Sequence, residues 1–542
     1  MEMPARPLPD LSQSGSAFWT GGARGELRIG WCPACRRHLH PARETCDGCG
    51  GAEFEFTPID GKATLLSFTV NHQPWLSGVP VPYVIGIVAP NAAPRVHLTT
   101  NIVDCAPERL AIGMPVAVRF ERCDDVWLPV FAPADGPPAP VDIRPPAPAI
   151  RPRGAAEKFE RRSAITGVGM SQLGRRLARS EGLLAVDACR AAIGDAGLRI
   201  EDIDGIAAYP GSEGLPGISR GGVRGLEQAL GIRPTWHCGA QEVAGQLGVV
   251  VEAMLAVAAG LCRHVLCFTS FSDRRRPSLE GPAAGRVSGE LAWQLPYGAA
   301  SPANWIALCA SHYLARYGVG REALGWIAVS ARRHAAGNPR AIYRDSLGLD
   351  DYFAARPVST PFGLFDCDVP CSGAAAVVVS ERGAARDLAH LPVCVEAVGT
   401  AMAESQTWDQ GTLTHQMNVF GPAAHLWSRS EFKAADVDLA CLYDGFTFNA
   451  LSWLEALGFC GIGEGGDFVA GGGRIGPGGD LPLNPHGGHL AEGRTQGWGN
   501  LVEAVAQLRG RAAGRQVAGA QLAVVSSGGG IPAGCMLLSR GS

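Results

Sequence analysis

The sequence predicts an α/β protein in which a small N-terminal module, made of a metal-binding ribbon and a β-barrel, precedes a long C-terminal body. Three observations lead to this fold class. Paired Cys-x2-Cys motifs lie near the N-terminus, short β-rich runs follow them, and strands then alternate with helices to the end of the chain. Because 542 residues exceed one ordinary core, several domains are expected.

The composition is that of a globular protein. Hydrophobic residues make up 46% of the chain and charged residues 18%, with a formal net charge of −4. The start, "MEMPARPLPD", has no apolar core, so we expect no signal peptide. The stretch "VAGQLGVVVEAMLAVAAGLC" contains Glu and Gln and is predicted to be a buried helix, not a membrane span. Seventeen cysteines, mostly single and in apolar runs, indicate reduced core residues of a cytoplasmic protein.

Residues 1–55 are predicted to form an N-terminal helix and a zinc ribbon. Two Cys-x2-Cys pairs are separated by ten residues. Two such pairs supply the four thiolates that a tetrahedral structural zinc site needs, and a disulfide is the less favoured alternative. The expected ligands are Cys32, Cys35, Cys46 and Cys49.

Residues 56–132 are predicted to form a small barrel of the OB-fold type. Short β-rich runs such as "ATLLSFTVNH", "PYVIGIVAP", "RVHLTTNIV" and "PVAVRFERC" alternate with Gly, Pro and Asn turns. A ribbon with an OB barrel can bind nucleic acid, but a phosphate-backbone binder needs a basic face. Residues 1–132 hold 11 Lys and Arg against 13 Asp and Glu, so nucleic acid is not an expected partner.

Residues 133–157 are predicted to be a linker, because "PADGPPAPVDIRPPAPAIRP" contains eight prolines and favours an extended chain. The body that follows reads as two similar α/β halves, residues 158–385 and 386–542. The segment "IEDIDGIAAYPG" in the first half and "AADVDLACLYDGF" in the second share one pattern of polar turn, strand and loop. "SAITGVGMSQLG" and "LPVCVEAVGTA" are a second, fainter pair.

Four stretches of the body point to a known family. They are "RRHAAGNPRAIYRD", "DCDVPCSGAAAVVVS", "YDGFTFNALSWLEALGFCGIGEGGDFVAGG" and "LPLNPHGGHLAEGRTQG". The body resembles the thiolase superfamily, in its lipid-transfer and sterol-carrier-protein-x branch, and is most similar to the steroid side-chain-cleaving aldolases. "FWTGGARGELRIGWCPAC" and "CDGCG" resemble the zinc-ribbon/OB-fold domains that accompany such acyl-CoA proteins.

This resemblance implies a duplicated thiolase-like fold fused to a module that is usually a separate chain. It also implies a homodimer formed through the body, with the apolar runs "CVEAVG" and "VLCFTSF" as candidate interface segments. A hydratase subunit is a candidate partner. The implied substrate is an acyl-CoA thioester.

Thiolase chemistry itself is not expected to survive. Counted back from the end of the helix at Gly260, the position of the nucleophilic cysteine falls near Val243, and Cys238 lies five residues too early. Ser526 or Ser527 stands where the second cysteine belongs. Arg494 replaces the histidine of the superfamily. These losses argue against acyl transfer through sulfur.

A retro-aldol reaction needs no covalent intermediate. A base removes the proton of a β-hydroxyl group, a ketone leaves, and the acyl-CoA enolate is protonated. A Schiff-base route needs a buried lysine, but Lys62, Lys158 and Lys433 are the only lysines, and none lies in a suitable segment. Four thiolates leave a zinc ion no open position for catalysis. By resemblance, the products are a 17-ketosteroid and propionyl-CoA.

Candidate catalytic residues lie in two motifs. Tyr443 replaces the histidine of the related His-Asp stretch and is expected to take the β-hydroxyl proton while passing its own to a neighbour. Asp444 beside it is a weaker candidate that suits a loop-fixing role. In "NPHGGH", His486 and His489 are candidates for donating to the thioester oxygen. Arg494 is a further candidate, with phosphate binding or loop anchoring as alternatives.

Two further groups are candidates for contact with the substrate. Backbone amides of Gly528, Gly529 and Gly530 are expected to form an enolate hole. Tyr297 in "QLPYGAASPANW" is a candidate cavity residue, with an ordinary loop tyrosine as the alternative. Two other functions stay open: a non-catalytic acyl-CoA or sterol carrier, and a thiolase or acyltransferase that uses Cys238.

Overall fold

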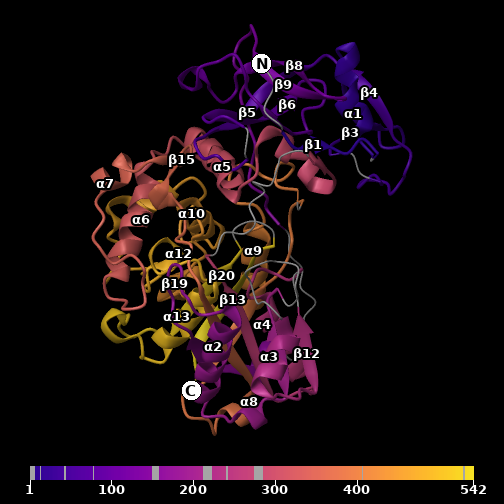
Figure 1. Cartoon of the computed structure of the whole chain (residues 1–542). Coiled ribbons are helices and arrows are strands. Elements are labelled where there is room, and N and C mark those ends of the chain that lie inside the picture. Colours follow the sequence, from indigo (N-terminus) through magenta and orange to yellow (C-terminus); the bar gives the residue numbers. More distant parts are fainter. Residues whose placement is uncertain are drawn as a thin grey trace.

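The chain forms a small β module set on one end of a larger α/β body (Figure 1). This computed structural model describes residues 6–12, 14–41, 44–76, 79–148, 158–210, 222–239, 242–273, 285–405, 407–528 and 532–541.

The N-terminal module contains the predicted ribbon and barrel. A short helix precedes a three-stranded ribbon in the order β3-β2-β4, and the barrel strands follow. The ribbon elements are α1 (Ser16–Thr20), β2 (Leu27–Cys32), β3 (Arg37–Leu39) and β4 (Glu55–Ile59). The barrel strands are β5 (Lys62–Asn71), β6 (Tyr83–Pro90), β7 (Leu98–Asn101), β8 (Pro115–Cys123) and β9 (Val126–Pro133). Strand β9 contains Pro129, and it pairs along its length only with β8, where a proline is tolerated.

The body is built on a nine-stranded sheet in the order β12-β11-β13-β17-β10-β18-β21-β20-β19. The strands of its first half are β10 (Ser163–Met170), β11 (Gly205–Ala208), β12 (Trp236–Gly239), β13 (His264–Phe271) and β17 (Gly373–Glu381). Those of its second half are β18 (Val393–Gly399), β19 (Leu439–Cys441), β20 (Leu522–Ser527) and β21 (Gly534–Arg540).

Helices pack against both halves of this sheet. Helix α4 (Gly248–Ala258) lies in an apolar cluster with β13, β17 and helix α13 (Trp498–Leu508), as its apolar sequence predicts. The other main helices are α2 (Glu181–Ala196), α3 (Gly222–Leu230), α5 (Pro302–Tyr317), α6 (Glu322–Ala335), α9 (Phe420–Arg429) and α10 (Thr447–Ala456). Within the described part of the chain, no helix has both the length and the apolar character that crossing a membrane requires.

The two halves repeat one strand arrangement about the β10–β18 pair. In the first half β11 runs parallel to β13, and in the second β19 runs parallel to β20. Asp204 accepts hydrogen bonds from the backbone N–H groups of Arg263 and His264 at the start of β13. Asp438 does the same for Gln521 and Leu522 at the start of β20. The duplication expected from the sequence is therefore present in strand order and in local contacts.

The two apolar runs expected at a dimer interface lie inside the sheet. "VLCFTSF" forms β13, which pairs with β11 and β17, and "CVEAVG" forms β18, which pairs with β10 and β21. A strand that is paired on both sides offers no free edge, so this interface assignment is wrong. The outer strand of the first half is β12.

A hairpin of the body extends the barrel sheet and joins the two parts. Strands β15 (Pro357–Ser359) and β16 (Phe362–Gly363) follow β5 in the sheet order. Asn304 of α5 is fully buried, and its Nδ2 lies 3.0 Å from both Asn71 Oδ1 of β5 and Ser359 Oγ of β15. One side chain thus connects three elements of the junction.

Residues 134–148 of the predicted linker contain no helix or strand, while 149–157 lie outside the described residues. Val141 and Ile143 pack against the apolar core of the body, and Arg316 of α5 donates to the Val141 carbonyl. The described part of this segment therefore lies along the body.

Replacing Asn304 by Ala should destabilise the junction by about 1–3 kcal/mol, because Asn71 and Ser359 lose a buried hydrogen-bond donor. The measurement is the urea midpoint followed by tryptophan fluorescence. Asp142→Ala is the control, since the Asp142–Arg316 ion pair is exposed and such pairs contribute about 0–1 kcal/mol. Equal midpoints for the two variants would contradict the assigned role of Asn304.

Candidate active site

A cavity of about 1460 Å³ lies where the module meets the two halves of the body. Trp75 of the barrel contributes to one wall, and α4, α5 and the segment around Trp408 contribute others. Polar groups enter it from the carboxyl ends of strands, which is where open α/β sheets place ligands. The lining residues that matter below are Tyr209, Val243, Trp305, Asp368, Trp408, Tyr443, Gly445 and Arg494.

Tyr443 is held at the cavity wall by its backbone and by its ring. It follows β19, and its N–H donates to Ser526 Oγ at 2.9 Å. Its ring packs against His489, with 4.7 Å between ring centroids. A Cβ atom on Gly445 would lie 2.7 Å from Tyr443 Cε1, so only glycine leaves room for this ring position. The Tyr443 hydroxyl makes no hydrogen bond within the described residues, so it is available to a ligand.

Burial raises the pKa of Tyr443 well above that of a free phenol, and the negative charge of Asp368 raises it further. The nearby guanidinium of Arg494 acts in the opposite direction, but its effect on this pKa is smaller. The hydroxyl is therefore protonated at neutral pH. It can accept a proton only as its own proton leaves.

Arg494 and Asp368 form a two-pronged ion pair beside Tyr443. Arg494 Nε and Nη2 each lie 2.6 Å from a different oxygen of Asp368, and this partner raises the pKa of the guanidinium. The third nitrogen, Nη1, makes no hydrogen bond within the described residues. Since Arg494 lines the cavity, the pair offers a fixed positive charge to a bound ligand.

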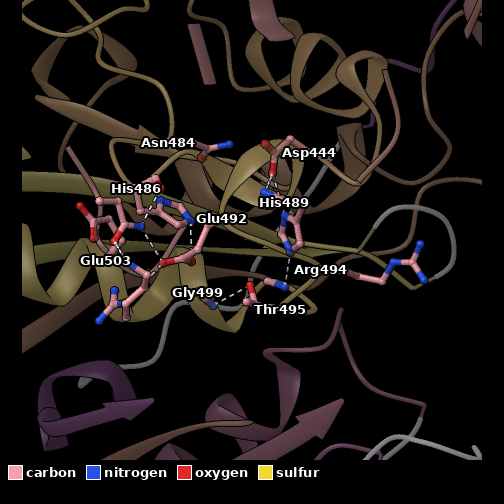
Figure 2. Close-up of polar contacts among 12 residues, drawn as sticks. Asp444, Asn484, His486, His489, Glu492, Arg494, Thr495, Gly499 and Glu503 are labelled. Atoms are coloured by element: carbon pink, nitrogen blue, oxygen red, sulfur yellow. Dashed lines mark hydrogen bonds and ion pairs between the residues drawn. The ribbon is translucent and has the colours of Figure 1, made fainter. Parts of the chain in front are cut away.

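His489 and Asp444 are buried behind Tyr443 and hold the loop that carries Arg494 (Figure 2). Asp444 Oδ1 accepts hydrogen bonds from the His489 N–H at 2.8 Å and from Nδ1 at 2.7 Å. His489 Nε2 accepts from the Gly497 N–H at 2.8 Å. The proton of the neutral ring is thus on Nδ1, and both nitrogens are engaged. This geometry favours the loop-fixing role for Asp444.

His486 lies in a separate buried cluster, on the side of the loop opposite to Arg494 (Figure 2). Its Nε2 lies 3.7 Å from Glu492 Oε2, and neither ring nitrogen has a hydrogen-bond partner within the described residues. It does not line the cavity. Its position therefore offers no direct contact with a ligand there.

The other two groups expected to contact the substrate were Tyr297 and the glycines 528–530. Tyr297 lies elsewhere, and only one of the glycines is among the described residues. Tyr297 is fully buried in the apolar core of the module and does not line the cavity. Gly528 adopts a left-handed backbone with φ +91°, and its carbonyl accepts from Gln416 Nε2 at 2.9 Å. Gly529 and Gly530 lie outside the described residues.

The cavity wall holds Val243 where the thiolase resemblance places a nucleophilic cysteine. Cys238 lies on β12, outside the cavity lining, and burial raises the pKa of its thiol. The Ser526 and Ser527 hydroxyls accept hydrogen bonds from backbone N–H groups of Tyr443 and Leu247. These contacts give the two serines a role in holding the backbone.

The three lysines are also absent from the lining. Lys62 and Lys433 are exposed, and Lys158 donates to the Arg429 carbonyl. A Schiff-base mechanism therefore has no lysine at the described cavity wall.

Several lining residues were not singled out in the sequence. Asp368 lies within "DCDVPCSG", a stretch that carried the family resemblance, so its motif was a usable signal. Tyr209 occupies the same place in "IAAYPG" as Tyr443 in "ACLYDG". Trp305 and Trp408 stack with 5.9 Å between ring centroids, and their separation in sequence gave no sign of this contact.

The four predicted zinc ligands come together in the ribbon, with their Sγ atoms within 4.8 Å of one another. Cys32 and Cys49 Sγ lie 3.7 Å apart, and Cys35 and Cys46 Sγ lie 3.6 Å apart. A tetrahedral ion with metal–sulfur bonds of about 2.3 Å requires sulfur separations of about 3.8 Å. The backbone N–H of Gly48 points at Cys46 Sγ and stabilises a thiolate. The donor set fits a closed zinc site.

Three family models match separate parts of the chain. Residues 19–55 match the ChsH2 rubredoxin-like zinc ribbon domain, and residues 56–121 match the ChsH2 C-terminal OB-fold domain. Residues 399–538 match the thiolase C-terminal domain-like family. These matches confirm the predicted ribbon, barrel and thiolase-like body.

Named relatives match either a long or a short part of the chain. A steroid side-chain-cleaving aldolase of Thermomonospora curvata is 34% identical over 397 residues, 69% of this chain and 97% of the relative. The 17-hydroxy-3-oxo-4-pregnene-20-carboxyl-CoA lyase of Mycobacterium tuberculosis is 33% identical over 398 residues, 69% and 98% of the two chains. A "Probable enoyl-CoA hydratase alpha subunit" of T. curvata is 34% identical over 131 residues, 24% of this chain and 40% of that protein.

Solved structures agree with this assignment. The Ltp2-ChsH2(DUF35) aldolase matches with a TM-score of 0.64 and 31% identity, over 70% of this chain and 98% of that chain. A monomeric SCP2-thiolase-like protein from Mycobacterium smegmatis shares the fold, with a TM-score of 0.53 and 18% identity over 70% and 77% of the two chains. The chain therefore belongs to the family of the steroid side-chain-cleaving aldolases, with a thiolase-like body and a zinc-ribbon/OB-fold module in one polypeptide.

Proposed function

We propose that the protein is a carbon–carbon lyase that cleaves a β-hydroxyacyl-CoA by a retro-aldol reaction without a covalent intermediate. The observation that carries this proposal is the cavity corner in which Tyr443 adjoins the Arg494–Asp368 pair, with Val243 in the wall near the place where the resemblance to thiolases predicts a nucleophile. Such a corner can move a proton and stabilise negative charge. The thiol that lines the cavity belongs to Cys309 of α5, and burial raises its pKa, which disfavours the thiolate that acyl transfer needs.

The reaction uses Tyr443 and Arg494 in different roles. Tyr443 accepts the proton of the substrate β-hydroxyl group as its own proton leaves, and the carbon–carbon bond then breaks to give a ketone. The electron pair of that bond forms the enolate of the acyl-CoA. Arg494, held by Asp368, lowers the energy of the negative charge through its free Nη1 group. The α-carbon finally takes a proton.

The proposed substrate is the CoA thioester of a 17-hydroxy steroid side chain, and the products are a 17-ketosteroid and propionyl-CoA. Two relatives that align over nearly their whole length carry names of this activity. The cavity is consistent with a bulky rigid acyl group, because its 1460 Å³ is partly walled by the stacked Trp305 and Trp408.

Two other functions are less consistent with the geometry. A thiolase or acyltransferase would need the Cys238 thiol at the substrate, yet Cys238 lies on β12 outside the cavity lining. A non-catalytic carrier of acyl-CoA or sterol would use the same cavity. It would not need the ion pair beside Tyr443, and it would release no ketone.

We also propose that the Cys32, Cys35, Cys46 and Cys49 cluster holds a structural Zn²⁺ ion. Zinc there would contribute folding free energy to the ribbon, and the four thiolates would leave no position for substrate. The cytoplasmic location and a hydratase partner stay predictions, the second supported by the similarity of 24% of this chain to a probable enoyl-CoA hydratase alpha subunit.

Replacing Tyr443 by Phe should reduce ketone release from a β-hydroxyacyl-CoA by about 10²–10⁴-fold, because the proton of the hydroxyl group then lacks an acceptor. Substrate affinity and the fold should be retained. Cys238→Ala is the matched control and should leave turnover nearly unchanged. An inactive Cys238→Ala together with an active Tyr443→Phe would instead support acyl transfer through sulfur.

Purified protein should contain one zinc ion per chain, measured by elemental analysis. Cys32→Ser should lose the metal and unfold the ribbon, since a structural site needs all four thiolates. Cys105→Ser, a change at a half-buried cysteine outside the cluster, is the control and should keep the metal. Fully folded wild type without zinc would disprove the site.

The body should form a homodimer, for which the outer edge of β12 (Trp236–Gly239) is the available strand in the described sheet. Light scattering should then give about twice the 56.6 kDa mass of one chain. A proline in place of Cys238, which interrupts backbone pairing at this edge, should shift the mass toward the monomer. A monomeric wild type would count against the dimer.

A further inference from the structure

Tyr209 and Tyr443 occupy the same place in the two halves of the body. Tyr209 directly follows β11, and its N–H donates to the carbonyl of Phe268 on β13 at 3.1 Å. Tyr443 follows β19, and its N–H donates to Ser526 Oγ on β20. The strand registers are also equivalent, because Gly205 pairs with Val265 and Leu439 pairs with Ala523.

The shared position is fixed by the same local contacts in each half. Asp204 caps the start of β13 and Asp438 caps the start of β20, each five residues before its tyrosine. Thr269 Oγ1 additionally donates to the Tyr209 carbonyl at 3.0 Å, which holds the backbone of this tyrosine on β13. Duplication of the fold thus presents two tyrosines from two equivalent strand ends.

Both tyrosines line the one cavity, although they come from different halves of the body. Negative charge on Tyr209 would raise the pKa of Tyr443, while the Tyr443 hydroxyl makes no direct hydrogen bond to Tyr209 among the described residues. Burial raises the pKa of Tyr209 as well, so both phenols are protonated at neutral pH. Neither can act as a base by resting as a phenolate.

Because Tyr443 is protonated at neutral pH, it cannot carry out both proton transfers of the reaction alone. A retro-aldol cleavage removes a proton from the β-hydroxyl oxygen and adds one to the α-carbon. A phenol with a raised pKa can accept the first proton only if its own proton moves on at the same time. The group that receives it must lie in the cavity and must be able to supply a proton to the α-carbon.

We propose that Tyr209 is a second catalytic residue, which receives through a bridging water the proton that leaves Tyr443 and donates its own proton to the α-carbon of the enolate. The inference rests on the proposed retro-aldol function and names the proton donor of its last step. Tyr209 and Tyr443 then form a relay across the cavity, with Arg494 stabilising the charge beside Tyr443.

The relay balances in protons and electrons. The β-hydroxyl O–H bond breaks and its proton goes to Tyr443 Oη, while the Tyr443 proton goes to a bridging water, which passes one of its own protons to Tyr209 Oη. The Cα–Cβ bond breaks, its electron pair forms the enolate, and the new C–H bond is made with the Tyr209 proton. Both tyrosines end as neutral phenols. No oxidant, reductant or additional base is consumed.

The test is a double-mutant cycle of Tyr209→Phe, Tyr443→Phe and the double variant, with the CoA thioester of a 17-hydroxy steroid side chain as substrate. Ketone release gives kcat and KM, and circular dichroism with thermal melting verifies the fold of each variant. Tyr343→Phe is the control, because Tyr343 does not line the cavity and its hydroxyl accepts only a 3.3 Å contact from Arg175.

Tyr209→Phe should lower kcat by about 10²–10⁴-fold with KM changed by less than about 3-fold. The kcat of the double variant should lie within about 3-fold of that of the slower single variant. A relay that is already broken at one step loses little more when the other step is removed. Such non-additivity is not expected of a residue that only supports the fold.

Three results would overturn the relay while leaving the proposed function intact in an active wild type. These are a Tyr209→Phe variant within about 3-fold of wild-type kcat, losses that multiply in the double variant, and a rise in KM with unchanged kcat. Failure of wild type itself to release ketone would instead overturn the proposed function, and the relay with it.

Discussion

The ion pair between Arg494 and Asp368 is the interaction on which the active corner depends. Its two parallel hydrogen bonds join the loop after "NPHGGH" to the segment before β17. The backbone N–H of Arg494 also donates to the Val369 carbonyl. The Asp368 side chain is 10% exposed and that of Arg494 is 43% exposed, so solvent screens the pair and its loss costs less than the about 3–5 kcal/mol of a fully buried pair. The same pair therefore fixes the loop and sets the charge next to Tyr443.

The other polar groups around Tyr443 and Arg494 mainly hold the backbone of these two residues in place. Asp444 Oδ1 accepts from His489, and His489 Nε2 accepts from the Gly497 N–H, so these contacts hold the loop that carries Arg494. Ser526 holds the backbone of Tyr443. The fold is thiolase-like, and the correspondence predicted from the sequence has a valine and serines at the sulfur positions and an arginine at the histidine position.

Local sequence patterns were sufficient for the parts of the fold that short-range physics determines. The Cys-x2-Cys pairs gave the ribbon, the apolar runs gave most barrel strands, and the repeat of "DVD" and "DID" gave the two halves. Strand β9 was not among the runs named in the sequence, although most of it lies within the predicted barrel, and its Pro129 is atypical of a strand. Tyr443 and Arg494 were found through their motifs. The partner of Arg494, the stacking of Trp305 on Trp408 and the burial of Tyr297 in the module depend on distant contacts that no local pattern encodes.

The joining of the N-terminal module to the body has a consequence for assembly. Trp75 of the barrel forms part of the cavity wall, and Thr99 of β7 binds Asp409 beside Trp408 at 2.7 Å. A pocket completed by a separate subunit is lost when that subunit dissociates at low concentration. In a single polypeptide the two parts always occur in equal number and at a high effective concentration, so dilution does not remove a wall of the pocket.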